Sequence, residues 1–267
     1  MTRRIRSRST GTRVGSWRRR GQGVGQGGVP RASPLHSAHM DLLEELARIY
    51  AERPDWVTGY ISLRDARFLL SRALEGDGDL LVELGTASGM STVALAYALR
   101  SGRLVTYDID THFYADRTKR VGDAARVMLS SEQLAGIEFR NPASALNLRE
   151  DCGPDTIPFL FIDANHKHPW PTLDLLAVLP CLKVGAEVVM HDINLPEISP
   201  DFQTWGAKRL FDDLVAEKRL DEAAAIPNIG SVVIPPDKAA FRAQLVGILH
   251  RHPWETDAPE GLVEQLG

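Results

Sequence analysis

The chain has little cysteine and no long apolar run. Cys152 and Cys181 are the only cysteines among its 267 residues, too few and too far apart for a disulfide framework or a zinc site. No apolar stretch approaches the about 20 residues that a membrane-spanning helix needs, and no apolar core follows the early arginines as a signal peptide requires. We therefore expect a cytoplasmic protein with no membrane partner, whose two cysteines are buried free thiols.

Acidic residues are missing from the first part of the chain. Residues 1–39 contain nine arginines and no Asp or Glu, whereas the rest carries 22 basic and 35 acidic residues. An Arg/Gly-rich segment without periodic apolar positions is expected to be disordered. It could contact nucleic acid or an anionic membrane, act as a transit peptide, or result from a gene start placed upstream of Met40, and we favour the last over a binding arm. The acidic remainder argues against nucleic acid as a partner.

The remainder has the composition of a soluble globular protein, with 43% apolar and 25% charged residues in the whole chain. Apolar periodicity predicts helices over 41–52 and 61–75. Strands then alternate with helices: strands at 80–84, 103–108, 136–140, 157–163 and 186–191, and helices at 90–100, 112–130, 143–149, 170–182 and 203–218. Near-continuous apolar strands that alternate with helices indicate a doubly wound α/β fold with a mostly parallel sheet.

The last strands must run antiparallel. "AAAIP" (223–227) and "IGSVVIPP" (229–236) are separated by too few residues for a helical crossover. We therefore divide the chain into a disordered tail at 1–39, N-terminal helices at 40–77, an α/β domain at 78–250 and a C-terminal tail at 251–267.

A glycine turn follows the first predicted strand and reads "ELGTASG" from Glu83 to Gly89. Gly85 allows the main chain to approach a ligand, and Gly89 allows the next helix to pack close to the strand. The turn has neither the G-x-G-x-x-G fingerprint of dinucleotide sites nor the Gly-Lys-Ser/Thr end of a phosphate loop. A pyrophosphate ligand is therefore disfavoured, and the charge of Glu83 would repel one further.

A second acid, Asp108, ends the next strand, "LVTYDID". Its distance from Gly85 matches the offset of about 20 residues at which an acid in such folds reaches ribose hydroxyls. A nucleoside without phosphates that carries positive charge near Glu83 satisfies both observations, and S-adenosylmethionine is such a molecule. The alternative is that both acids are strand-end residues that face solvent.

The sequence resembles class I S-adenosylmethionine-dependent methyltransferases, in particular their small-molecule O-methyltransferase-like branch. The resemblance covers about residues 78 to 235 and is carried by "LLVELGTASGMSTVALA", "LVTYDID", "FLFIDANHKHPWPTLDLLAVLPCLKVGAEVVMHDI" and "WGAKRLFDDL". It implies a Rossmann-like methyltransferase fold of seven strands, the last of them antiparallel, preceded here by a helical extension.

The resemblance also implies cofactor-binding positions. Asp108 would hold the ribose, Ser144 would approach the adenine, and Asp163 would border the cofactor. The methionine end would be lined by Glu83, Gly85, Thr86, Gly89 and Ser91. The chain departs from the family at Ala143, where many relatives carry an acid near the adenine amino group.

Acids and histidines gather where the fourth and fifth strands end. Parallel strands place Asp163 and the pair His191–Asp192 at the same rim as the glycine turn. Transfer of a methyl group to a hydroxyl needs an aligned, activated acceptor, and a base with a pKa near neutrality helps. His166 is our candidate base because its ordinary pKa is about 6.5 and it follows Asp163 by three residues. The catalytic candidates are therefore His166 and Asp163, and loop polarity is the alternative for His166.

A divalent cation could also activate the acceptor. Asp163 and Asp192, with His191 or Asn194 as a further ligand, could hold Mg²⁺. Related metal enzymes carry an acid-acid or Asp-Asn pair at the position of His191–Asp192, so one oxygen ligand is missing here. Mn²⁺ or another ion that tolerates imidazole is then a further candidate, and His191 could instead be a buried strand histidine.

The leading hypothesis is a methyltransferase that acts on a hydroxyl of a small molecule. Helices 41–75 and the segment "NLPEISPDFQTWGAKRL" are candidates for a lid over the acceptor. Trp170 and Trp205 could wall its pocket or simply pack. An NAD-dependent oxidoreductase and a non-catalytic nucleoside-binding module are the alternatives, and a homodimer is compatible with each.

Overall fold

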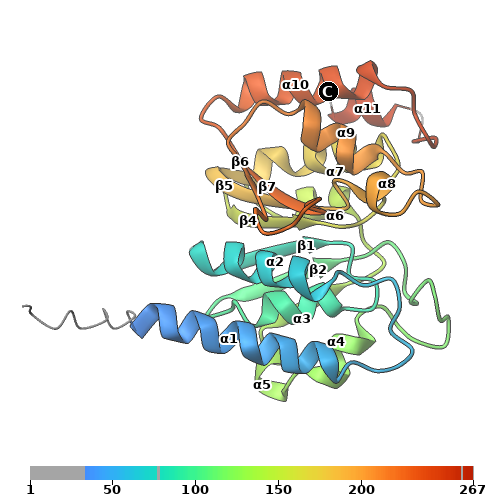
Figure 1. Cartoon of the computed structure of the whole chain (residues 1–267). Helices are drawn as coiled ribbons and strands as arrows, with labels where there is room; N and C mark the ends of the chain where they lie inside the picture. Colours follow the sequence, from blue (N-terminus) through green and yellow to red (C-terminus); the bar gives the residue numbers. More distant parts are fainter. Residues whose placement is uncertain (1–33, 77–78, 260, 267) are drawn as a thin grey trace, which may run out of the picture.

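A seven-stranded sheet forms the centre of the computed structural model, which describes residues 34–76, 79–259 and 261–266 (Figure 1). Of the tail expected at 1–39, residues 1–33 lie outside the described part. The strands lie in the order β3-β2-β1-β4-β5-β7-β6. Their bounds are β1 Leu80–Leu84, β2 Arg103–Tyr107, β3 Ile137–Arg140, β4 Ile157–Ile162, β5 Leu182–His191, β6 Lys218–Leu220 and β7 Ile229–Val233.

The strand directions confirm the predicted fold class. Strands β1 to β5 are all parallel, whereas β7 runs antiparallel to both β5 and β6. The chain builds outward from β1 to β3 and then returns to place β4 on the other side of β1. In open α/β sheets such a reversal leaves a crevice at the carboxyl ends of the strands, which is where ligands bind.

Two layers of helices cover the sheet (Figure 1). One layer holds α1 (Pro34–Ala51), α2 (Leu63–Glu75), α3 (Met90–Ala96), α4 (Asp123–Met128) and α5 (Ser131–Ala135). The other holds α6 (Ala145–Asp151), α7 (Trp170–Val178) with the 3₁₀ turn η1 (Leu179–Cys181), α9 (Gly206–Asp213), α10 (Lys238–Arg251) and α11 (Leu262–Leu266). The short helix α8 (Leu195–Ile198) follows β5.

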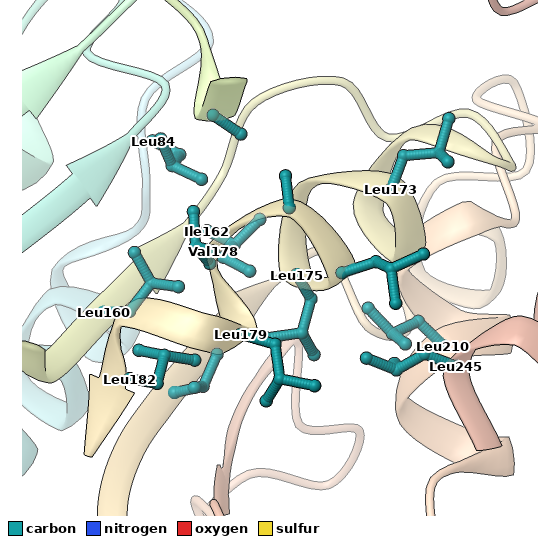
Figure 2. Close-up of a cluster of buried hydrophobic side chains, with 14 of the residues drawn as sticks. Leu84, Leu160, Ile162, Leu173, Leu175, Val178, Leu179, Leu182, Leu210 and Leu245 are labelled. Carbon is teal, nitrogen blue, oxygen red and sulfur yellow. The ribbon is translucent and has the colours of Figure 1, made fainter. Parts of the chain in front are cut away.

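Alternate residues of each strand feed the two cores. In β1, Leu81 packs with α1, α2 and α3, whereas Val82 and Leu84 pack with the helices of the opposite layer. Figure 2 shows the second core, where Leu84 and Ile162 face Leu173 and Val178 of α7. The burial of both faces explains why a central strand such as β4 is apolar along its whole length.

The N-terminal helices are fixed to the sheet by more than apolar contact. α1 begins at Pro34, earlier than the expected 41. The side chain of Ser62 caps α2 by accepting a hydrogen bond from the backbone N–H of Asp65. Arg72 of α2 pairs with Glu187 of β5 at 2.6 Å, and both side chains are largely buried. α2 therefore sits rigidly above the strand that ends at the predicted site.

Three expected elements differ from the structure, one after β2 and two before β7. The helix expected at 112–130 is only α4, because residues 109–121 lack apolar periodicity and Gly122 caps the helix with a φ of +79°. The helix expected at 203–218 ends at Asp213, and the strand expected at 223–227 lies earlier, as β6. Asp221 accepts hydrogen bonds from the backbone of Ala223 and Ala224, which turns the chain away from the sheet after β6.

The C-terminal segment packs onto the domain instead of forming a tail at 251–267. Leu262 and Leu266 of α11 are buried in the core around α7, since apolar side chains at this spacing share one helix face. Within the described ranges, no helix combines the length and the apolar character needed to cross a membrane.

Candidate active site

The glycine turn after β1 lies directly against the end of β4. Gly85 has a φ of +98°, and a Cβ at this position would collide with the carbonyl of Asp163 and the Cα of Ala164. Its backbone N–H donates to the carbonyl of Tyr107 at 2.8 Å. A residue without a side chain therefore brings the ends of β1, β2 and β4 together.

Glu83 supports this turn from beneath. Its side chain is fully buried and accepts hydrogen bonds from the hydroxyls of Thr92 and Thr106, both at 2.6 Å. Burial raises the pKa of Glu83 to about 7, although hydrogen bonds from Ser91, Thr106 and Thr92 oppose the shift. The side chain thus shapes the turn and does not face the adjoining cavity.

A cavity of about 1300 Å³ opens beside the turn at the carboxyl ends of the strands. Most of the predicted site residues line it: Gly85, Asp108, Ser144, Asp163, His166, His191 and Asp192. Four predicted cofactor residues are buried and do not line it: Glu83, Thr86, Gly89 and Ser91. Their contact with a cofactor stays a prediction.

Asp108 occupies the wall of the cavity at the end of β2. Its carboxylate accepts the backbone N–H groups of Ala87 and Asp110, each at 2.9 Å. Burial raises the pKa of this carboxyl, and the same backbone hydrogen bonds counteract the shift. The next loop is tied to Asp108, since the N–H of Ala143 donates to the Asp108 carbonyl at 2.7 Å. Ser144 follows and caps α6 with its hydroxyl.

His166 lies between two carboxylates. Its Nε2 is 3.2 Å from Oδ1 of Asp163, and its Nδ1 is 2.9 Å from Oδ2 of Asp192. His191 stands beside them, with Nδ1 at 3.2 Å from Asp163 Oδ1 and at 3.3 Å from Asp192 Oδ1. The sequence prediction that β4 and β5 bring these four residues to one rim is confirmed.

The contacts among the two histidines and the two carboxylates shift the pKa values of all four groups. Burial lowers the pKa of His166, but hydrogen bonds to Asp163 and Asp192 outweigh it and raise the pKa to about 10. For His191, burial is likewise outweighed by the charges of Asp163 and Asp192, and its pKa lies well above the ordinary value. Burial raises the pKa values of both carboxyls, yet the charge of His191 and the other imidazole contacts hold them below their usual range.

Two contributors to the cluster were not predicted. Asp65 of α2 places Oδ2 at 3.4 Å from Nε2 of His191, and Asn228 donates its amide to Asp192 Oδ1 at 2.7 Å. Both lie far from β4 and β5 in the sequence, so no local motif marks them. Asn194, which we considered as a metal ligand, does not line the cavity, because Lys208 and the carbonyl of Pro227 occupy its carboxamide.

Three side chains of the cluster could hold a metal ion. Asp163, His191 and Asp192 each offer a ligand atom, and these atoms lie within 4.8 Å of one another. The nitrogen that would bind is Nδ1 of His191, while the carboxylate of Asp65 lies beside Nε2. A carboxylate behind a ligating imidazole is a common arrangement in metal sites, so the residues fit a divalent cation.

The two tryptophans that we considered as walls of an acceptor pocket lie in different places. Trp170 lines the cavity and Trp205 does not. Trp205 instead directs its backbone N–H to Glu255 at 3.0 Å. His168 is fully buried and does not line the cavity.

Part of the chain matches the model of a known family. Residues 82–193 match the model of a methyltransferase domain. No curated protein matches the chain.

The fold is also similar to several solved structures, each of which has a low sequence identity to this chain. The O-methyltransferase from Streptomyces achromogenes involved in tomaymycin synthesis, solved with S-adenosylmethionine, is 22% identical over 73% of this chain and 90% of its own, with a TM-score of 0.48. The Bacillus cereus O-methyltransferase in complex with S-adenosylhomocysteine is 20% identical over 77% and 93%, with a TM-score of 0.49. A Podospora anserina methyltransferase with bound S-adenosylhomocysteine is 13% identical over 78% and 99%, with a TM-score of 0.49.

The matched residues span β1 to β5 and include the glycine turn, Asp163 and the His191–Asp192 pair. The match to a methyltransferase domain therefore covers the part of the chain that carries the glycine turn and the cluster of acids and histidines.

Proposed function

We propose that the chain is an S-adenosylmethionine-dependent methyltransferase that transfers the methyl group to a hydroxyl of a small molecule. One observation carries the proposal: a single cavity joins the glycine turn and Asp108 to His166, which lies between two carboxylates. The first part suits a nucleoside without phosphates, and the second suits removal of a proton from an acceptor.

The cofactor would lie against the turn. The carboxylate of Asp108 would accept hydrogen bonds from the ribose hydroxyls, as acids at this position do in related folds. Gly85 leaves the main chain open to the methionine part, and the carboxylate of Asp163 lies beside it, where a positively charged sulfur is stabilised. No phosphate-binding loop follows β1, which disfavours NAD.

Methyl transfer would proceed by in-line displacement. The acceptor oxygen forms a bond to the methyl carbon while the carbon–sulfur bond breaks, and the sulfonium becomes a neutral thioether. The hydroxyl proton passes to Nε2 of His166, while Asp192 holds Nδ1 and thereby orients the ring. Because Nε2 contacts Asp163 in the structure, the hydroxyl would take the place of this contact.

A divalent cation, Mg²⁺ or Mn²⁺, would bind to Asp163, His191 and Asp192. When bound, it would stabilise the developing negative charge on the acceptor oxygen. Asp65 would then orient His191 through Nε2, and Asn228 would hold Asp192 in place.

The acceptor would occupy the side of the cavity away from Asp108. Here the wall is formed by the loop before α2 and by the segment from α8 to α9, the two regions expected to form a lid. Ile198 and Phe202 are 45% and 60% exposed although they border the cavity. Apolar side chains at its mouth favour an acceptor with an apolar body.

Calorimetry with S-adenosylhomocysteine tests the cofactor assignment. We expect the wild type to bind and Asp108→Ala to bind at least about tenfold more weakly, because hydrogen bonds to a charged group are lost. Glu132→Ala, an exposed change on α5, should bind as the wild type does. Equal affinity of Asp108→Ala and the wild type would contradict the assignment, and titration with NADH, followed by its fluorescence, separates the oxidoreductase alternative.

Turnover with an identified hydroxyl acceptor tests the chemistry. His166→Ala should lower kcat by roughly 10²-fold or more while S-adenosylhomocysteine still binds. Chelation should abolish turnover, and Mg²⁺ or Mn²⁺ should restore it if the cation is required. Full turnover of His166→Ala would exclude this base, and binding without turnover of any acceptor would favour the nucleoside-binding module.

We also propose that the protein is cytoplasmic and that it forms a homodimer. Cell fractionation and sedimentation of the purified chain, respectively, test them.

A further inference from the structure

Asp174 is a carboxyl with no partner in the described part of the chain. It lies in α7 between Leu173 and Leu175, both buried in the core, and its side chain borders the cavity. It makes no hydrogen bond or ion pair with any described residue. Burial alone raises its pKa to about 7.

The surroundings of Asp174 form an apolar lobe of the cavity. Its walls come from Ala143 and Leu146 at the start of α6, Trp170 and Ala177 of α7, and Leu262 and Leu266 of α11. Among the described residues that line the cavity, Arg64 is the one lysine or arginine, and it belongs to α2 in the opposite layer. No lysine or arginine among the described residues of this lobe is therefore available to neutralise Asp174.

Asp174 is half-buried in the cavity wall, and a carboxyl that loses part of its water and gains no hydrogen bond costs stability. Such a group is understandable at a binding site, where the ligand supplies the missing donor. The lobe offers apolar walls, among them the indole of Trp170, and the unpaired carboxyl of Asp174, so it suits a planar ring that carries an amino group.

The lobe adjoins the wall that the proposed function assigns to ribose. Ala143 borders the lobe, and its backbone N–H is bonded to the carbonyl of Asp108 at 2.7 Å. A nucleoside held by Asp108 could therefore extend its base past Ala143 toward α7. Ala143 itself has no acceptor side chain to offer to that base.

We propose that Asp174 accepts a hydrogen bond from the 6-amino group of adenine and so selects adenine among the bases. The inference rests on the proposed function, because it places the adenine of S-adenosylmethionine in this lobe. The acceptor for the 6-amino group would then come from α7, because Ala143 in the loop after β3 has no acceptor side chain.

Calorimetry with two ligands tests the inference. One ligand is S-adenosylhomocysteine, and the other is its analogue in which hydrogen replaces the 6-amino group. The wild type should prefer the first by about tenfold or more, because the analogue leaves the buried carboxyl unpaired. Asp174→Leu should bind both ligands equally, to within about twofold, whereas Asp174→Asn keeps an acceptor oxygen and should keep most of the preference.

Glu150→Leu is the matched control, since Glu150 is exposed on the neighbouring helix α6. It should discriminate between the ligands as the wild type does. An unchanged preference in Asp174→Leu would overturn the inference and leave the proposed function intact. Failure of the wild type to bind S-adenosylhomocysteine would remove both. If Asp174→Leu changes only the affinity for an amine-bearing acceptor, the carboxyl serves the acceptor and not adenine.

Discussion

At the scale of single residues, the chemistry of the site depends on which group each imidazole nitrogen contacts. Both nitrogens of His166 and both nitrogens of His191 lie within hydrogen-bond reach of carboxylates. An imidazole in that position keeps its proton more strongly than a free histidine does. If His166 is the base, as we propose, its protonation and not its location would limit catalysis at neutral pH.

The pH dependence of kcat/KM follows from this arrangement. The pKa of His166 is raised to about 10, and the base must be neutral to act. Without added metal, kcat/KM should thus rise as pH increases above 7, with an apparent pKa above the ordinary value of about 6.5. A pH profile measured with subsaturating acceptor checks this, and a limb at the ordinary value would show that the carboxylates do not act on His166 in the working enzyme.

At the scale of elements, the loop that carries His166 is fixed by the C-terminal segment. The carboxylate of Glu255 accepts the backbone N–H of His168 at 2.6 Å and that of Trp205 at 3.0 Å, while its own N–H donates to the His168 carbonyl at 2.8 Å. Glu255 therefore joins the loop before α7 to the start of α9.

Glu255→Ala should reduce catalysis and not cofactor binding. Loss of the two hydrogen bonds would let the His166 loop shift, and small displacements of a catalytic group lower kcat by roughly tenfold or more. Affinity for S-adenosylhomocysteine should stay within about twofold of the wild type, and Glu255→Gln should recover part of kcat because its carbonyl still accepts. A parallel loss of affinity would show that the segment holds the cofactor site.

Elements that bury one continuous apolar run were predicted well from the sequence. The five parallel strands and α7 fall close to their expected places because their burial leaves a regular pattern. The segment before α4 and the position of β6 were missed, because turns at Gly122 and Asp221 decide them. Asp65 and Asn228 could not be predicted, since only the packing of α2 and β7 brings them to His191 and Asp192.

At the scale of the whole molecule, the unpaired carboxyl of Asp174 should make the stability of the protein depend on pH. The folded-state pKa of Asp174 is raised from 3.8 to about 7. The unfolded chain releases this proton above pH 4, whereas the folded chain retains it until about pH 7. Because the unfolded state then binds fewer protons, the free energy of unfolding should fall as pH rises through this window.

Asp174→Asn should remove this part of the decline. Relative to the wild type, the free energy of unfolding of the variant should increase by on the order of 2–4 kcal/mol between pH 4 and 8. Urea denaturation at both pH values measures it, with Glu150→Gln as the control on an exposed carboxyl. Parallel pH dependence of Asp174→Asn and the wild type would mean that Asp174 ionises normally in the folded protein.

Gly206 restricts where the cavity can open. Its N–H donates to the carbonyl of His166 at 2.9 Å, and a Cβ at this position would collide with the backbone of residues 166–168. α9 and the loop that carries His166 are therefore held in close contact. If residues 195–205 act as the lid that we expected, an acceptor could pass them while this contact keeps the base aligned.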